Sequence, residues 1–143
     1  MLPLVIMIAT TGTVRALGRI AHVEALDSWA AATAVGMALM LLVMASAHFV
    51  PARRALLVEM VPPALGRPAW WVTLTGLLEV AGALGLLVPV TRSLAAVCVA
   101  VLLVAMFPAN VRAAREGVGI TSVRLPTRAL IQVLFVLACA VVA

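Results

Sequence analysis

The sequence predicts an all-α integral membrane protein, from its composition and from the length of its apolar stretches. Of the 143 residues, 66% are hydrophobic and only 10% are charged, whereas a soluble domain has about 45–50% apolar and about 25% charged residues. Four stretches approach or exceed the ~20 mostly apolar residues that a membrane-spanning helix needs. We therefore interpret residues 1–143 as one transmembrane domain: a four-helix bundle preceded by a short additional N-terminal membrane helix.

The first two predicted helices cover residues 2–18 and 29–50. The first is apolar but short, and Arg15 can extend its guanidinium to the membrane interface. Because no basic segment precedes it, a signal peptide is disfavoured, although the sequence leaves open whether this helix crosses the bilayer completely. The second helix, about 33 Å long at 1.5 Å per residue, is preceded by Asp27 and Ser28, either of which can cap it.

A short interfacial helix is predicted over residues 51–61, because paired arginines, leucines and Glu59 recur there at helical spacing. Pro62 and Pro63 stop it. The next spanning helix covers residues 70–88 and begins with two tryptophans, which are typical of the membrane interface.

The last two predicted spanning helices cover residues 93–114 and 127–143. A helix ending at Phe107 would be only about 22 Å long, which is short of the ~30 Å hydrocarbon core. We therefore expect it to continue past Pro108 and to carry Asn110 into the interface.

Arginine placement predicts the orientation of a multi-pass protein in the cell membrane, because cytoplasmic loops are enriched in basic residues. The ten arginines divide into two sets, seven on one side of the predicted topology and three on the other. The larger set is Arg53, Arg54, Arg67, Arg112, Arg115, Arg124 and Arg128; the smaller is Arg15, Arg19 and Arg92. The C-terminus is then expected outside. The ten arginines form no basic stripe interleaved with aromatic residues, so no nucleic-acid partner is expected.

Glu79 is the candidate centre of a functional site. A carboxylate near the middle of a span costs about 2.5–3.5 kcal/mol on insertion scales, and small residues on the same helix face would let other helices approach it. His48, Asn110 and Gln132 are each placed in the cytoplasmic half of a different helix. We expect these four side chains to line a polar ligand pocket that is closed by the interfacial helix, with Glu59 as a weaker fifth candidate.

A purely structural role is the alternative for these polar residues, since interhelical hydrogen bonds average only ~0.6 kcal/mol. No catalytic constellation or zinc spacing occurs. Met37, Met44 and His48 share a helix face that would suit copper(I), but no other helix supplies a matching set, so no metal site is expected. Cys98 and Cys139 lack the C-x-x-C pattern of redox pairs.

Four motifs resemble the DoxX-like family of small bacterial membrane proteins. They are HFVP from His48, EMVPP from Glu59, GLLEVAGALGLLVP from Gly76 and MFPAN from Met106. The resemblance covers roughly residues 29–143, and its matching positions are His48, Glu59, Pro62, Glu79, Gly82, Pro89 and Asn110. It implies a four-helix membrane bundle, a link to quinone-dependent thiosulfate oxidation or thiol and oxidative stress, and, from distant animal relatives, a role in assembling other membrane proteins. The first helix and the missing cysteine pair depart from this pattern.

Two functions are therefore expected. The first is non-enzymatic: an accessory or assembly factor in the bilayer that binds a hydrophobic ligand, such as a lipid, or a partner membrane protein. The second is a quinone-reactive subunit of an oxidoreductase complex, which would need a redox partner because this chain has no redox centre of its own. Transport through the Glu79 cavity is a third reading, but the outer half of the bundle lacks deep polar residues.

Overall fold

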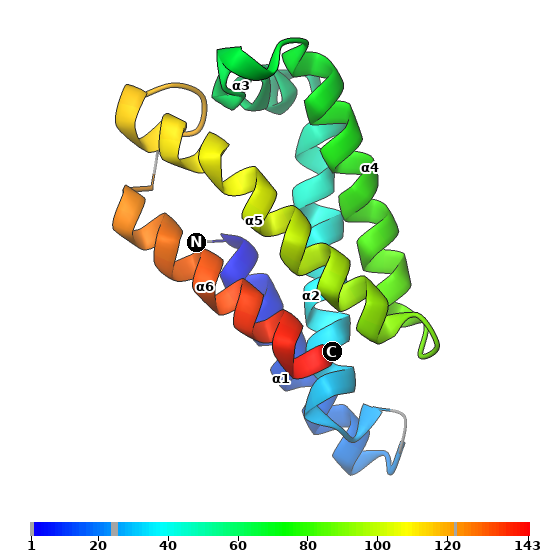
Figure 1. Ribbon diagram of the computed structural model, residues 1–143. Coiled ribbons are helices and arrows are strands. Elements are labelled where there is room, and N and C mark those ends of the chain that lie inside the picture. Colours follow the sequence, from blue (N-terminus) through cyan, green and yellow to red (C-terminus); the bar gives the residue numbers. More distant parts are fainter. Residues whose placement is uncertain (1, 24–25, 122) are drawn as a thin grey trace.

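The computed structural model describes residues 2–23, 26–121 and 123–143, and all regular secondary structure in them is helical (Figure 1). This confirms the predicted all-α class. The elements are α1 (Leu2–Ile20), α2 (Trp29–Phe49), α3 (Pro51–Met60), the 3-10 turn η2 (Pro63–Leu65), α4 (Pro68–Leu87), α5 (Arg92–Glu116) and α6 (Leu125–Val142).

Four of these helices, α2, α4, α5 and α6, are long and apolar enough to cross a membrane. They form a closed ring, in which α2 packs against α4 and α6, and α5 packs against the same two helices. Large apolar side chains such as Leu84, Leu94 and Leu137 point outward and are more than half exposed. Exposed apolar surface on this scale marks contact with lipid or another apolar partner. A multi-pass membrane protein accounts for both observations.

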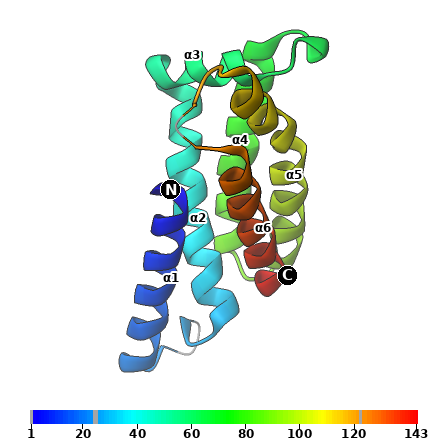
Figure 2. The same ribbon diagram turned by 90° about the vertical axis from the view of Figure 1, so that its left-hand side faces the viewer.

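Helix α1 lies outside this ring and packs along α2, as Figures 1 and 2 show. The two helices approach closely at Gly36, where an added Cβ would lie 2.2 Å from the Thr11 Oγ1 atom. Near the turn between them, Arg15 donates a hydrogen bond to Asp27, and its guanidinium lies 5.6 Å from the centre of the Trp29 ring. The N-terminal segment is therefore a helix fixed to α2, although it is not one of the four long apolar helices.

Proline and glycine set several helix limits. Pro51 occupies the first turn of α3, where its missing N–H costs nothing. Pro68 lets α4 begin two residues before the predicted start, after Arg67 has adopted a left-handed conformation with φ 42°. Helix α5 continues through Pro108 to Glu116 and ends at Gly117, whose φ of 68° is the usual helix-terminating conformation.

The two ends of the bundle differ in their connections. Helix α3 and the connection between α5 and α6 lie at one end, and the α1–α2 and α4–α5 turns lie at the other (Figures 1 and 2). Arg54 joins the elements at the α3 end by donating hydrogen bonds to the His48 and Ala69 carbonyl oxygens and to Thr73 Oγ1, at 2.8–2.9 Å. Arg54 of α3 thus links the end of α2 to the first turns of α4.

Candidate functional site

The structure separates the five predicted site residues into three places. His48 and Glu79 face each other between α2 and α4. Asn110 and Gln132 line a pocket on the other side of the ring, and Glu59 lies on the surface helix α3. The expectation that all of them surround one pocket centred on Glu79 therefore differs from the geometry.

Glu79 and His48 form a sealed pair. Glu79 is fully buried, at 0% exposure, and His48 is 4% exposed. The His48 Nε2 atom lies 3.5 Å from Glu79 Oε2, beyond the 2.7–3.2 Å of a regular N–H···O bond. Neither oxygen of Glu79 has a hydrogen-bond partner among the described residues. The acid is enclosed by packing, and it lines neither of the two pockets described below.

The His48 ring is oriented by the backbone of α4. Its Nδ1 atom lies 2.7 Å from the Val72 carbonyl oxygen, and because a carbonyl only accepts, Nδ1 carries a hydrogen. The Nε2 atom, on the opposite side of the ring, faces Glu79 Oε2. The imidazole therefore stands between the α4 backbone and the Glu79 carboxyl group.

Gly76 explains why α4 comes so close to His48. A Cβ at this position would lie 2.6 Å from the His48 Cβ atom, a separation that would force the two helices apart. Glu79 is three residues later on the same helix, so the glycine brings its carboxyl within reach of the imidazole. The sequence predicts small residues on the Glu79 face; of these, Gly76 packs against the His48 side chain, whereas Gly82 packs against Val99.

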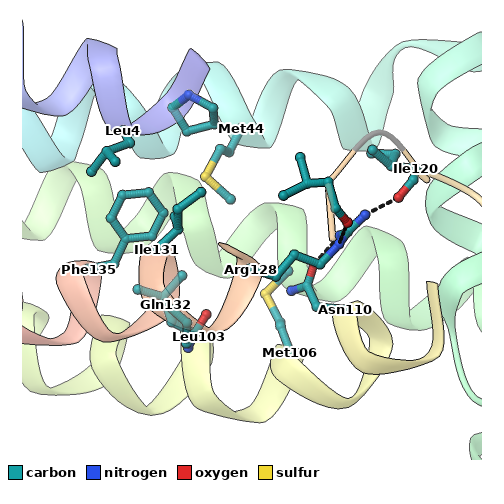
Figure 3. Close-up of a pocket in the computed structure, with 12 residues that line it drawn as sticks. Leu4, Met44, Leu103, Met106, Asn110, Ile120, Arg128, Ile131, Gln132 and Phe135 are labelled. Atoms are coloured by element: carbon teal, nitrogen blue, oxygen red, sulfur yellow. Dashed lines mark hydrogen bonds between the residues drawn. The ribbon is translucent and has the colours of Figure 1, made fainter. Parts of the chain in front are cut away.

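A pocket of about 170 Å³ lies between α5 and α6 and is bordered by the start of α1, by α2 and by the segment before α6 (Figure 3). We call it the α5–α6 pocket. Most of its lining is apolar, contributed by Pro3, Leu4, Met44, Leu103, Met106, Ile120, Val123, Ile131 and Phe135. Its polar lining residues are Asn110, Arg128 and Gln132. A pocket with apolar walls and a few convergent polar groups is the usual form of a small-molecule site.

Arg128 organises the polar end of this pocket. It donates 2.8 Å to Asn110 Oδ1 and 2.9 Å to the Val123 carbonyl oxygen, and it also donates to the Ile120 carbonyl oxygen (Figure 3). All three acceptors are neutral, and no carboxylate of the described residues forms an ion pair with it. Of the five N–H groups of a guanidinium, two remain for other partners.

Gln132 adds a second incompletely bonded group. Its Nε2 atom is buried and has no hydrogen-bond partner in the described part of the chain. Buried amide groups without a partner are uncommon, and each calls for an explanation such as a bound molecule. Arg128 lies within the predicted helix 127–143, but the sequence-based prediction uses it only to infer orientation. The available signal was its spacing of four residues from Gln132, which places both side chains on one face of a helix.

Glu59 makes a structural contact at the α3 end of the bundle. Its Oε2 atom accepts a hydrogen bond of 3.2 Å from the Gly119 backbone N–H, and Arg112 donates to the Glu59 carbonyl oxygen at 2.6 Å. The Glu59 side chain is exposed. Its bond to Gly119 attaches the α5–α6 connection to α3. Glu59 is not among the residues that line the α5–α6 pocket.

A second pocket, of about 320 Å³, lies between α4 and α5. Its lining includes Gly82, Ala95 and Val99, and its only polar side chains are those of Thr91 and Cys98. The Thr91 hydroxyl already donates 2.9 Å to the Gly85 carbonyl oxygen. With no charged group in its lining, this pocket offers packing surface and little chemistry.

The family model for a domain of unknown function, DUF8561, matches residues 37–143, from the middle of α2 to the end of α6. The chain belongs to this family. No curated protein and no solved structure matches it. The matched range contains His48, Glu79, Asn110, Arg128 and Gln132, whereas α1 lies before it.

Proposed function

We propose that the chain is a polytopic membrane protein that binds an amphiphilic ligand in the α5–α6 pocket and acts as an accessory or assembly factor for another membrane protein. One observation carries this proposal: a largely apolar pocket ends in the guanidinium of Arg128 and the unpartnered amide of Gln132. Such a site matches a molecule with an apolar body and a polar head.

The proposed setting is a bilayer with the α3 end in the cytoplasm and the C-terminus outside. Seven of the ten arginines belong to the α3 end or to the connections there, which favours this orientation by the positive-inside rule. The α5–α6 pocket would then open in the cytoplasmic half of the membrane. Helix α1 would lie in the membrane as a fifth helix beside α2.

The accessory role draws on the resemblance to the DoxX-like family. Two of the shared motifs contain His48 and Glu79, which meet across α2 and α4, and a third ends at Asn110, which accepts a hydrogen bond from Arg128. The motifs thus coincide with contacts that hold the helices and the pocket together. They support a common architecture with that family and, through it, a non-enzymatic function.

A quinone-reactive subunit of an oxidoreductase complex is the second candidate. A quinone brings two carbonyl acceptors, and the donors free to meet them are the Gln132 amide and the remaining N–H groups of Arg128. Electrons would have to come from a partner subunit.

The proposal is tested by identifying what the purified protein carries. Native mass spectrometry of the protein in mild detergent is expected to show a co-purified amphiphile. Ile131→Trp, which fills the pocket, is expected to lower its amount at least about tenfold, whereas the matched Leu130→Trp change on the exposed face of α6 leaves it unchanged. Equal retention of the amphiphile by both variants would place its binding site outside the α5–α6 pocket. A protein that carries no amphiphile but binds a partner membrane protein would contradict ligand binding and retain only the assembly function.

A further inference from the structure

We infer that the α5–α6 pocket takes an anionic membrane lipid, with the acidic group of the lipid on Arg128 and Gln132 and its first acyl segment against the apolar wall. This inference rests on the ligand-binding function proposed above and specifies the charge and the class of the ligand. It follows from the charge, the donors and the size of the pocket.

No acidic side chain among the described residues compensates the charge of Arg128. The ion pairs among the described residues are Arg15 with Asp27, Arg112 with Glu116, and His48 with Glu79, and Arg128 belongs to none of them. Its partners are an amide oxygen and two backbone carbonyls. A partly buried cation that has only dipoles around it gains most from a bound anion.

Most of the groups left over for a ligand at the polar end are donors. The oxygens that face Arg128 are already engaged by it, namely Asn110 Oδ1 and the carbonyls of Ile120 and Val123. Among the described residues there remain the two free N–H groups of Arg128, the Asn110 Nδ2 group and, one turn further along α6, the Gln132 amide with its Nε2 donor and its Oε1 acceptor. Guanidinium and amide donors together match a phosphate or carboxylate, whose oxygens only accept.

The size and walls of the pocket favour a lipid over a free anion. A volume of about 170 Å³ lies below the roughly 300–1,000 Å³ of a complete small-molecule site. It therefore accommodates a head group and the adjoining methylenes, while the rest of a chain extends between the helices into the bilayer. The apolar residues along the pocket, from Met106 beside Asn110 to Ile131 and Phe135 farther from Arg128, supply the surface for that first chain segment (Figure 3).

The test uses the full-length protein in nanodiscs of phosphatidylcholine with a minor fraction of phosphatidylglycerol. Native mass spectrometry after release from the disc counts the lipids that stay bound. Wild type is expected to retain phosphatidylglycerol at least about tenfold over its share in the disc, since charge-assisted hydrogen bonds differ from neutral contacts by that order. Arg128→Gln is expected to abolish the preference, and Arg124→Gln, the same loss of charge four residues earlier on the surface, is expected to keep it.

Gln132→Glu provides the test if Arg128→Gln does not fold, because it removes none of the hydrogen bonds that Arg128 makes to the protein. The new carboxylate would neutralise the charge of Arg128 and repel the acidic head group of the lipid, so the preferential retention of phosphatidylglycerol should again be lost. A wild-type protein without preference, or an Arg124→Gln loss as large as that of Arg128→Gln, would overturn the inference.

Two further probes separate this inference from the function on which it rests. Inorganic phosphate that displaces phosphatidylglycerol at equal concentration would identify a free-anion site and overturn the lipid. Decylubiquinone retained by wild type but not by Ile131→Trp, with no bound phosphatidylglycerol, would overturn the anionic ligand and leave the proposed function standing. A pocket that retains none of these molecules would overturn both.

Discussion

The two polar clusters of this bundle, the sealed His48–Glu79 pair and the open end of the α5–α6 pocket, show opposite ways of keeping polar groups in an apolar protein. In the first, a buried imidazole and a buried carboxyl group face each other 3.5 Å apart, and Glu79 lines neither of the two pockets. In the second, Arg128 and Gln132 keep donors that no other described residue uses. Burial alone therefore does not identify a binding site here. The distinguishing property is whether polar groups remain unpartnered beside a pocket.

The largest effect is expected from breaking the sealed pair. His48→Leu leaves Glu79 buried without its partner and should lower the free energy of unfolding by about 3–5 kcal/mol, as measured by denaturant unfolding in detergent. The double variant His48→Leu/Glu79→Leu replaces both groups with apolar ones and should recover much of the loss. A single variant that unfolds like wild type would show that the pair is not a structural unit.

The next effect is expected at Gly76, which sets the distance between α4 and His48. Gly76→Ala places a methyl group 2.6 Å from the His48 Cβ atom and should cost about 1–3 kcal/mol through overpacking. Gly12→Ala on α1 is the matched control, because nothing lies within 4 Å of its added Cβ, and a helical glycine replaced by alanine gains about 0.5–1 kcal/mol. Equal melting temperatures for the two variants would contradict the close α2–α4 contact.

A smaller energetic change, with a clear functional readout, is expected at the open cluster. Gln132→Met removes the unpartnered amide and keeps the length of the side chain. The thermal unfolding temperature should stay the same or rise, because no internal hydrogen bond of Nε2 is lost. Retention of the co-purified amphiphile should fall by about five- to tenfold. A strongly lowered unfolding temperature would assign Gln132 to the structural class of His48 and Glu79.

The smallest effect is expected at Glu59, whose carboxylate is exposed. Glu59→Gln weakens its bond to the Gly119 N–H and should change stability by less than about 1 kcal/mol. Hydrogen exchange at Gly119 should become faster, while ligand retention is unchanged. A loss of ligand equal to that of Gln132→Met would return Glu59 to the binding site.

The helices could be predicted from the sequence because their signals are local. The length of the apolar stretches marks α2, α4, α5 and α6. Prolines mark α3, with Pro51 at its start and Pro62 and Pro63 just after its end. The same reasoning placed the start of α4 at Trp70, although Pro68 in its first turn extends it by two residues. The continuation of α5 through Pro108 followed from the thickness of the bilayer, a constraint that is independent of side-chain contacts.

The site could be predicted only in part, because depth along a helix does not specify the direction in which a side chain points. Glu79, His48, Asn110 and Gln132 were all placed at suitable depth, yet the first two meet across the α2–α4 contact and the other two line the α5–α6 pocket. The count of arginines assigns Arg128 to one side of the membrane but carries no information about its contacts. Its role depends on carbonyl groups of the α5–α6 connection, whose position no helical periodicity encodes.

The bonds of Arg128 have a consequence beyond the pocket itself. The guanidinium that faces the apolar cavity also holds the carbonyls of Ile120 and Val123, and the same connection is attached to α3 through Gly119 and Glu59. A head group on the two free N–H groups of Arg128 would therefore share its guanidinium with the bonds that position this connection. Occupancy of the pocket would then bear on how firmly the α5–α6 connection is held against α3.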